Sequence, residues 1–567
     1  MTDVKALSRM ERPLLLSYTP KLLTVLREGY GAAELRKDTI AGLTVAIVAL
    51  PLSMAIAIAS GATPAQGLYT SIFGGFLVSL LGGSRFQIGG PAGAFIILVA
   101  ATVAKHGMDG LILATCLSGI MLTAVGVLRL GSFVQYVPFP VTVGFTAGIA
   151  VIIFASQIKD LLGLALLHEP GEILEKIAAL WQVRTSITPA AIALALTVVA
   201  LILLLRRVRP TWPGMLIAIV VASCGAFVLG LPVETIGSRF GGIPSALPRP
   251  ALPEVSLEKI SAVLPAAISF TLLGSIESLL SAVVADGMTG RKHRSNCELV
   301  AQGVANIGAA LFGGFCVTGT VARTATNVRA GAHGPVAGML HAVFLLVFVL
   351  IAAPLAAFIP LSALAGVLAV VAWNMIDQSA IRILIRSGIG ESVVLATTFL
   401  LTVFRDLTEA IVIGIALGGV VFIQRMSKAT SVTAHTHADV GLAQAAPALA
   451  PNEDILVYRI DGPLFFGAAG SIATALDRIH EHQSALILDL TNVSVLDATG
   501  SNMLLDLSRK ADSQSVTLWT AGARPSILRS LRVHGLQPPF CHHAANVAKA
   551  VAHHRAAVAE KSETADA

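Results

Sequence analysis

The stretch FCVTGTVARTATNVRAG, residues 315–331, places an arginine inside an otherwise apolar part of the chain. Small and hydroxyl-bearing residues (Thr318 to Thr320) precede Arg323, so we expect a short helix to begin here at membrane depth. The free amides at a helix start favour negative charge. An arginine adds a full positive charge and a forked set of donors suited to carboxylate, sulfate or bicarbonate. The stretch therefore predicts a buried anion site.

Composition sets the class of protein. Hydrophobic residues make up 55% of the 567 residues, charged residues make up 13%, and the chain is expected to cross a lipid bilayer many times. The net charge of +6 could suggest nucleic acid, but most basic residues lie in short loops between apolar runs, where they set topology. No nucleic-acid partner is expected. The five cysteines lie far apart without zinc or disulfide spacing, so we predict no metal site and no cofactor.

Apolar segments recur along the chain and organise it. Fourteen of them lie at about 40–59, 66–82, 89–104, 110–128, 135–155, 188–205, 213–231, 262–285, 299–314, 317–330, 335–353, 359–375, 390–405 and 408–424. Several are shorter than the roughly 20 residues that a full crossing needs, most clearly 89–104 and 317–330. We interpret these two as half-helices, in matching positions of two seven-segment halves, which indicates inverted repeats with a site between them.

Basic residues indicate the orientation. Arginines and lysines follow the sixth, eighth, twelfth and fourteenth segments, at Arg206, Arg207, Arg209, Arg291, Lys292, Arg294, Arg382, Arg386, Arg425 and Lys428. The loops they occupy are predicted to be cytoplasmic, with both termini on that side of the inner (plasma) membrane. The longer loops 161–187 and 232–261 are then external.

The early segments supply partners for the arginine. Pro51 is expected to interrupt the first segment next to Ser53, and QIGGPAGAF (87–95) places a second helix start inside the membrane. The predicted substrate-binding residues are Ser53, Gly90, Pro91, Ala92, Gly93, Ala94, Thr318, Gly319, Thr320 and Arg323.

The eighth segment carries an acidic residue. Glu277 lies in an apolar helix with Ser281 one turn further on the same face, and we predict a proton or cation site opposite the anion site. The alternative is that Glu277 pairs with Arg323 only to hold the two repeats together. Ser295 and Glu298 are predicted to form a capping box that starts the ninth segment.

After residue 428 the pattern changes to that of a small α/β domain. Short apolar strands (ILVYRI, ALILDLTNVSVLD, SVTLWT) enclose a helix at about 500–510, and Thr499 is expected in the turn that starts this helix. The predicted organisation is a cytoplasmic N-terminal region (1–38), a transmembrane transport domain (39–428), a linker (429–452), the α/β domain (453–553) and a disordered tail (554–567).

The segments LPLSMA, GGPAGAF, GSIESLLSAVVADGMTG and GTVARTATNVRAGA resemble the SulP anion transporters, also called solute carrier family 26. QIKDLLGL (157–164), VAWNM (371–375) and GPLFF (462–466) are similar to the bacterial C4-dicarboxylic acid transporter branch, and LDLTNVSVLDATG (488–500) resembles a STAS domain.

The resemblance implies an α-helical polytopic fold, UraA-like, with 14 transmembrane segments in two inverted repeats that form core and gate domains, followed by a cytoplasmic STAS domain. It also implies an elevator-like motion, an anion held between Pro91–Ala94 and Thr318–Thr320, and a STAS domain that serves dimer contact, trafficking or regulation. A homodimer is expected.

Two departures from the family pattern bear on coupling. Sodium-coupled bicarbonate members have aspartate where this chain has Glu277 and threonine where it has Val321, which disfavours sodium. Some proton-coupled relatives have a glutamate where Leu52 stands, so Glu277 is the expected proton carrier here. Proton–anion symport is the hypothesis, and anion exchange stays open because Arg323 alone can compensate the charge of the substrate.

Other function classes find less support. No catalytic nucleophile, phosphate loop or redox motif is visible, so we predict a transporter driven by gradients and no enzyme. Succinate or fumarate is the favoured substrate on resemblance, with sulfate or bicarbonate as alternatives. A nucleobase permease would need carboxylates in place of Arg323. A membrane sensor or scaffold acting through the STAS domain remains the alternative from a different class.

Overall fold

A computed structural model describes residues 17–132, 137–166, 170, 173–209, 212–405, 407–435, 454–466 and 483–565. The chain divides into two compact units, residues 1–416 and 417–567, and each is described by itself. Residues 1–16 of the predicted N-terminal region (1–38) lie outside the described residues.

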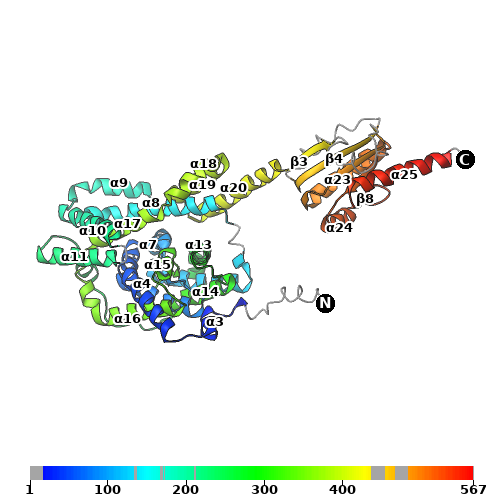
Figure 1. The fold of residues 1–567 in the computed structure, drawn as a ribbon. Helices are drawn as coiled ribbons and strands as arrows, with labels where there is room; N and C mark the ends of the chain where they lie inside the picture. The colour runs from blue at the N-terminus through cyan, green and yellow to red at the C-terminus, as the bar shows by residue number, and fades with distance from the viewer. Residues whose placement is uncertain are drawn as a thin grey trace. The chain divides into compact units, whose positions relative to one another are not determined.

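The first unit is helical (Figure 1). Its elements in chain order are α3 (Lys21–Glu28), α4 (Ala32–Ala59), α5 (Pro64–Tyr69), η1 (Thr70–Gly74), α6 (Gly75–Leu81), β1 (Gly89–Gly90), η2 (Gly93–Phe95), α7 (Ile96–Val127), α8 (Phe139–Leu162), α9 (Ile173–Gln182), η4 (Arg184–Ser186), α10 (Pro189–Val208), α11 (Gly214–Val228), α12 (Ile236–Phe240), α13 (Leu257–Thr289), α14 (Ser295–Leu311), β2 (Thr318–Gly319), α15 (Val321–Arg329), α16 (Val336–Ala356), α17 (Leu361–Met375), α18 (Gln378–Ser387) and α19 (Ile389–Phe404), followed by α20 (Leu407–Lys428), which crosses the boundary between the units.

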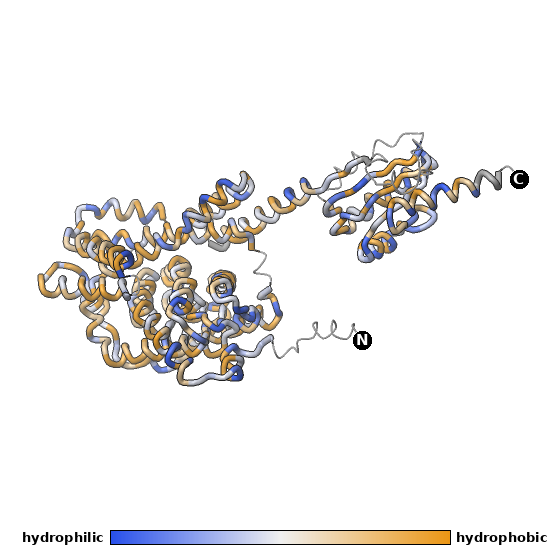
Figure 2. The backbone as a smooth tube through the Cα atoms, viewed as in Figure 1, coloured by the Kyte–Doolittle hydropathy of each residue, from blue (hydrophilic) through white to orange (hydrophobic). Residues whose placement is uncertain are grey.

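Hydrophobic residues run along most of these helices (Figure 2). Among the described residues, eight helices are long and apolar enough to cross a membrane, and α11 and α19 are shorter apolar helices. Many of their large apolar side chains remain exposed, as expected for surfaces that face lipid. The chain is therefore a multi-pass membrane protein, whereas the number of fourteen crossings stays a prediction.

Contacts between helices repeat across the two halves. Helix α4, first in its half, packs on α16, while α13, first in the second half, packs on α7. In the same way α10 packs on α17 and α19 packs on α8. These paired contacts are those expected of two interlocked inverted repeats, one group of helices around α4, α7, α13 and α16 and another around α8, α10, α17 and α19 (Figure 1).

The two predicted half-helices are present. The first lies at the beginning of α7, which is broken at Gly107, where φ is 69° and ψ is −175°. Glycine adopts this left-handed conformation without the steric penalty that a Cβ atom brings. The second, α15, has only 9 residues. Both are much shorter than a membrane-spanning helix.

The interruption expected at Pro51 does not occur. Helix α4 continues through Pro51 to Ala59. Proline removes one backbone donor, and in a membrane helix the surrounding helices and hydroxyl side chains compensate for this loss. The Ser53 hydroxyl donates to the Ala49 carbonyl of the same helix at 2.7 Å.

The second unit contains a sheet with helices packed on it. Its elements are β3 (Ser431–His435), β4 (Ile455–Leu464), β5 (Ala485–Asp489), β6 (Val493–Leu496), α23 (Ala498–Ser513), β7 (Thr517–Ala521), α24 (Pro525–Val533), β8 (His542–Ala544) and α25 (Val547–Ala565). The strand order is β3-β4-β5-β7-β8, with β6 on β4. Among the described strands of this sheet, β3 and β4 pair antiparallel and the other pairs are parallel. Leucines of β5 and of α23 share one apolar core, and Trp519 packs with α25 in another.

Two boundaries of this unit differ from the sequence-based expectations. Residues 431–435 of the predicted linker form β3, because they extend the ladder of β4. Most of the predicted tail belongs to α25, whose alanine-rich sequence favours a helix. Thr499 lies in the first turn of α23 as expected, but the capping side chain is that of Asp497, which accepts from the Gly500 amide at 2.7 Å. The remainder of the predicted linker (436–452) lies outside the described residues.

Candidate functional site

A short β ladder joins the two helix starts. Gly89 pairs with Gly319 and Gly90 pairs with Thr318, in antiparallel register. The chain then enters η2 and α7 after Ala92, and it enters α15 after Thr320. Segments more than 200 residues apart in sequence therefore present their helix starts side by side. Their free amides and positive dipole ends make this a favourable place for an anion.

Arg323 lies beside the ladder and is almost completely buried, with 1% of its surface exposed. Its Nη2 donates to the Ser53 hydroxyl at 3.1 Å and to the Pro91 carbonyl at 3.2 Å, and its Nη1 donates to the Ser71 hydroxyl at 3.2 Å. A Cβ atom at Gly90 would lie 1.9 Å from Nη1, so the guanidinium occupies space that only glycine leaves free.

The partners of Arg323 are neutral. Among the described residues, no carboxylate lies within ion-pair distance of its guanidinium. Its Nε also has no hydrogen-bond partner. A buried charge without a counter-charge is costly, so the site gains stability from any anion that it binds.

Glu277 and Ser281 are both on α13, but they have different surroundings. The Oε2 atom of Glu277 is buried without a hydrogen-bond partner. The Ser281 hydroxyl donates to Thr324 Oγ1 at 3.0 Å. No hydrogen bond joins Glu277 to Ser281, and no ion pair joins Glu277 to Arg323. The structure therefore does not contain the Glu277–Arg323 pair that was the structural alternative.

The other predicted binding residues gather around the ladder. Ser53, Gly90, Pro91, Ala92, Ala94, Thr318, Gly319 and Thr320 are buried, and Gly93 is half-buried. Thr318 donates to the Gly274 carbonyl of α13 at 3.4 Å, which brings this helix to the site one turn before Glu277. The hydroxyl of Thr320 is buried without a partner.

The site faces the second group of helices. A Cβ atom at Gly93 would lie 2.9 Å from Ile153 of α8 and 3.8 Å from Met375 of α17. The first of the two helix starts thus lies against α8 and α17.

Several polar residues that hold the site in place were not singled out from the sequence. Asn306 of α14 accepts from the Val317 amide at 3.0 Å and donates to the Val317 carbonyl at 2.8 Å. Gln87 donates to Ser278 at 3.2 Å. Asn306 is a polar residue inside an apolar segment, and that was the signal by which it could have been found. Gln87 lies between two apolar segments and carries no such signal.

The capping box predicted for Ser295 and Glu298 is not formed. The Glu298 carboxylate accepts from the Ser84 amide at 3.0 Å and from Gln302 at 3.1 Å, and the α14 start has no side-chain cap. The capping-box prediction was therefore wrong, because a tertiary partner competes for the carboxylate.

Among the described residues, no group of three or more His, Cys, Asp and Glu side chains is arranged to hold a metal, and the five cysteines are free.

Comparisons with known proteins agree with this architecture. A family model described as the sulfate permease family matches residues 35–398, and a STAS domain model matches residues 446–550. The putative sulfate transporter YvdB of Bacillus subtilis is 40% identical over 515 residues, which cover 90% of this chain and 95% of that protein. The bicarbonate transporter BicA of Picosynechococcus is 31% identical over 520 residues, covering 88% and 90% of the two chains.

Solved structures show the same fold. The transmembrane domain of a cyanobacterial BicA is similar with a TM-score of 0.61 at 30% identity, covering 69% of this chain and 98% of that domain. Murine Slc26a9, an anion transporter solved in an inward-facing state, is similar with a TM-score of 0.83 at 19% identity over 96% and 95% of the two chains.

Proposed function

The chain belongs to the sulfate permease (SulP or SLC26) family of anion transporters, and we propose that it moves a small inorganic oxyanion bound between the two helix starts beside Arg323. One observation carries this proposal. Arg323 is buried and, in the part of the chain that the structure describes, hydrogen-bonded only to neutral groups, so a bound anion supplies the missing charge. Relatives named as sulfate or bicarbonate transporters favour an oxyanion of that class.

The proposed binding residues are those that surround the ladder: Ser53, Gly90, Pro91, Ala92, Gly93, Ala94, Thr318, Gly319, Thr320 and Arg323. Backbone amides of two helix starts and one guanidinium recognise charge and approximate size more than a particular anion. Transport follows an elevator-like movement of the helices around α4, α7, α13 and α16 against those around α8 and α17. Orientation in the inner membrane with cytoplasmic termini, and a homodimer, are part of the same proposal.

A C4-dicarboxylate such as succinate is the second candidate substrate. It is favoured by the stretches 157–164, 371–375 and 462–466, which are similar to the C4-dicarboxylic acid transporter branch. The same site accommodates it in principle, because a carboxylate and an oxyanion present similar acceptors to amides and to arginine.

Glu277 is the proposed carrier of a coupling proton. Its buried Oε2 lacks a partner, and a neutral carboxyl is the less costly form of such a group in a membrane. Ser281, one turn further along α13, belongs to the same proposed site, and its hydroxyl donates to Thr324 Oγ1. If Glu277 does not carry a proton, exchange of one anion for another is the expected mode.

Uptake into proteoliposomes tests the proposal. Labelled sulfate, bicarbonate and succinate are supplied with and without an inward proton gradient, to the native protein and to Arg323→Ala. The matched control is Arg329→Ala, an exposed arginine at the end of the same helix, which should transport normally.

We expect uptake of sulfate or bicarbonate that requires Arg323. Uptake of succinate alone would move the substrate to the second candidate. Full uptake in Arg323→Ala would refute the proposed site, and no uptake of any anion by the native protein would favour the sensor or scaffold function.

The coupling role is tested by Glu277→Gln, with Glu258→Gln as control. Glu258 lies in the exposed first turn of the same helix. The proposal expects that Glu277→Gln removes the stimulation by a proton gradient, whereas uptake with an unchanged pH dependence would exclude the proton role.

A further inference from the structure

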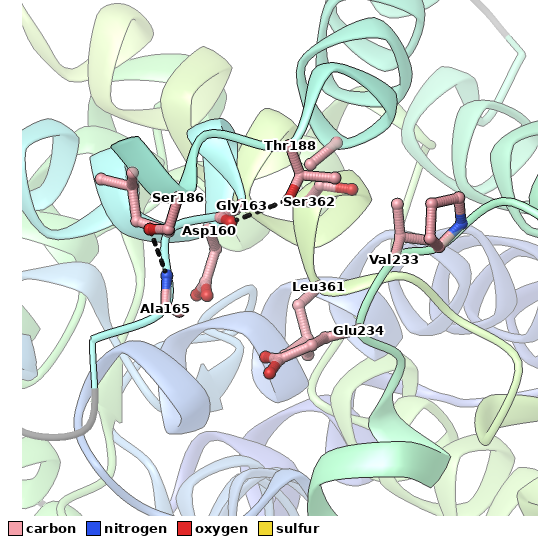
Figure 3. A pocket seen from close by; sticks show the side chains of 12 residues that line it. Asp160, Gly163, Ala165, Ser186, Thr188, Val233, Glu234, Leu361 and Ser362 are labelled. Atoms are coloured by element: carbon pink, nitrogen blue, oxygen red, sulfur yellow. Dashed lines mark hydrogen bonds between the residues drawn. The ribbon is translucent and has the colours of Figure 1, made fainter. Parts of the chain in front are cut away.

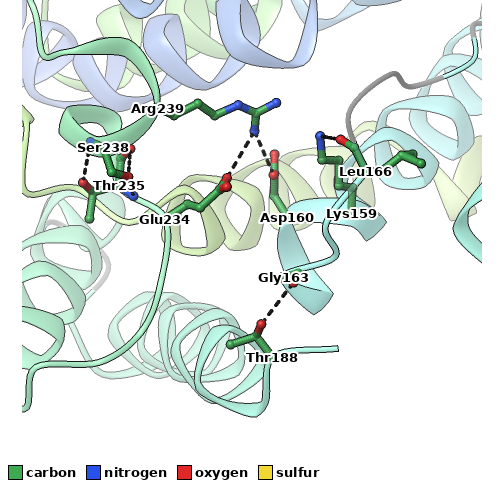
Figure 4. Close-up of polar contacts among 9 residues, drawn as sticks. All are labelled: Lys159, Asp160, Gly163, Leu166, Thr188, Glu234, Thr235, Ser238 and Arg239. Atoms are coloured by element: carbon green, nitrogen blue, oxygen red, sulfur yellow. Dashed lines mark hydrogen bonds and ion pairs between the residues drawn. The ribbon is translucent and has the colours of Figure 1, made fainter. Parts of the chain in front are cut away.

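The helices α8, α10 and α17 differ in charge between their two ends. At the end that the positive-inside pattern predicts to be external, a cavity of about 230 Å³ has Asp160 and Glu234 on its wall (Figure 3). Arg239 of α12 contacts both carboxylates, with Nη1 at 3.3 Å from Asp160 and 3.8 Å from Glu234 (Figure 4). The acidic side chains at this end therefore have a basic partner within the protein.

The opposite end of the same helices carries exposed arginines. They are Arg206, Arg207, Arg209, Arg382 and Arg386, and we call them the arginine surface. The first three lie at the end of α10, and the last two lie on α18, which begins soon after α17 ends. Arg206 Nη1 donates to the Asn374 side chain of α17 at 2.8 Å, so the ends of α10 and α17 lie side by side.

The arginine surface has an excess of positive charge. In the part of the chain that the structure describes, no ion pair joins any of its arginines to a carboxylate. The nearby Asp377 caps α18, because its carboxylate accepts from the amides of Ser379 at 3.1 Å and Ala380 at 2.9 Å. An anion from outside the protein can therefore neutralise this surface.

Helix α18 has the pattern of a helix that lies at the surface of a bilayer. Ala380 and Leu384 are buried in an apolar cluster with side chains of α8 and α19. Successive side chains turn by about 100° around a helix, so the two arginines of α18 lie on the side opposite this cluster. The exposed Ile383 and Ile385 flank them. Polar and apolar groups thus meet on the outer side of this helix.

Two exposed tryptophans border the arginine surface. The Trp212 amide donates to the Arg209 carbonyl at 3.0 Å, and Trp373 lies near the end of α17. Tryptophan is enriched where the lipid headgroups meet water. The tryptophans indicate that the arginines lie at the depth of the headgroups.

We propose that the arginine surface binds the headgroup of an anionic phospholipid, with the isoleucines of α18 against the acyl chains. A guanidinium forms paired, charge-assisted hydrogen bonds with phosphate. Clusters of basic residues next to membrane helices attract anionic lipids. Because the surface includes residues of α10 and α18 and adjoins the end of α17, the lipid ties the ends of these three helices together.

Titration of the purified full-length protein in detergent with labelled phosphatidylglycerol tests the proposal, with labelled phosphatidylcholine as the zwitterionic comparison. We expect phosphatidylglycerol to bind more tightly. Each arginine near an anionic surface contributes a factor of about five, so Arg382→Gln combined with Arg386→Gln should weaken its binding roughly thirtyfold. Both arginines are exposed, so this variant should fold as the native protein does.

The matched control is Arg36→Gln combined with Lys37→Gln, which removes the same charge from exposed positions of α4. It should bind phosphatidylglycerol as the native protein does, and an equal loss in this control would overturn the proposal. Equal affinity of the native protein for the two lipids, or equal affinity of the native protein and the α18 variant for phosphatidylglycerol, would also overturn it. Inorganic phosphate that competes as strongly as the lipid would overturn the assignment to a phospholipid.

Discussion

Replacing Gly90 with alanine should displace the guanidinium of Arg323. The new Cβ would lie 1.9 Å from Nη1, 3.0 Å from Cζ and 3.0 Å from the Ser71 hydroxyl. Carbon and nitrogen normally approach no closer than about 3.5 Å, so the guanidinium must move by about 1.5 Å. That movement breaks its 3.2 Å hydrogen bond to Ser71 and disturbs the bonds to Ser53 and Pro91.

The cost of this movement can be worked out from the contacts. A hydrogen bond from a charged group contributes about 1.5–3 kcal/mol, and overpacking of a tight site costs about 1–3 kcal/mol. A displaced guanidinium should therefore weaken the binding of an anion by about 2 kcal/mol, which corresponds to roughly thirtyfold in affinity. The expected result is an apparent KM for sulfate uptake that is higher by one order of magnitude or more.

The assay is initial uptake against substrate concentration in proteoliposomes, for native protein and Gly90→Ala. Gly225→Ala is the control, because a Cβ atom there would meet nothing within 4 Å. An unchanged KM in Gly90→Ala, or a KM that rises equally in Gly225→Ala, would refute the reasoning.

Two further predictions concern stability. Asn306→Leu leaves the amide and the carbonyl of Val317 buried without partners, so the free energy of unfolding should fall by about 3 kcal/mol. A thermal-unfolding temperature equal to that of the native protein would contradict this prediction. In the second unit, burial acts to raise the pKa of Asp489, but hydrogen bonds from Thr491 and Arg459 together hold it below its usual range. The stabilisation by this carboxylate is therefore complete above the unfolded pKa of about 3.9 and is lost as the pH falls through the lower folded pKa. Urea unfolding followed in the second unit should show that Asp489→Asn lowers the free energy of unfolding at pH 7 and lowers it by less near pH 3. A difference between the two proteins that grows towards acid would contradict the assignment.

The pairing of the two helix starts could be predicted from the sequence because it depends on local signals. Glycine and proline before Ala94, and the TGT sequence before Arg323, mark helix starts inside apolar segments, and half-helices in matching positions indicate inverted repeats. The structure places these starts next to each other through β1 and β2.

The partners of the charged residues could not be predicted, because they depend on contacts between distant segments. Ser71 lies in the π-helical turn η1 and reaches Arg323, although nothing in the local sequence distinguishes it from other hydroxyls in apolar segments. Glu298 has the spacing of a capping residue, yet it accepts from the Ser84 amide. In the case of Glu298, the tertiary partner outweighs a local capping pattern that is worth about 1 kcal/mol.

The asymmetry between the repeats follows from the same contacts. The first repeat contributes a neutral helix start, from Pro91 to Ala94, together with the Pro91 carbonyl and the Ser53 hydroxyl that accept from Arg323. The second repeat contributes the charge. Arg323 is therefore held mainly by groups of the opposite repeat, so a change in either repeat alters the position of the guanidinium. A site built in this way couples the local packing of both halves to the affinity for the anion. For this reason a substitution at Gly90, a residue without a functional group, is expected to affect transport as strongly as a substitution of a ligand does.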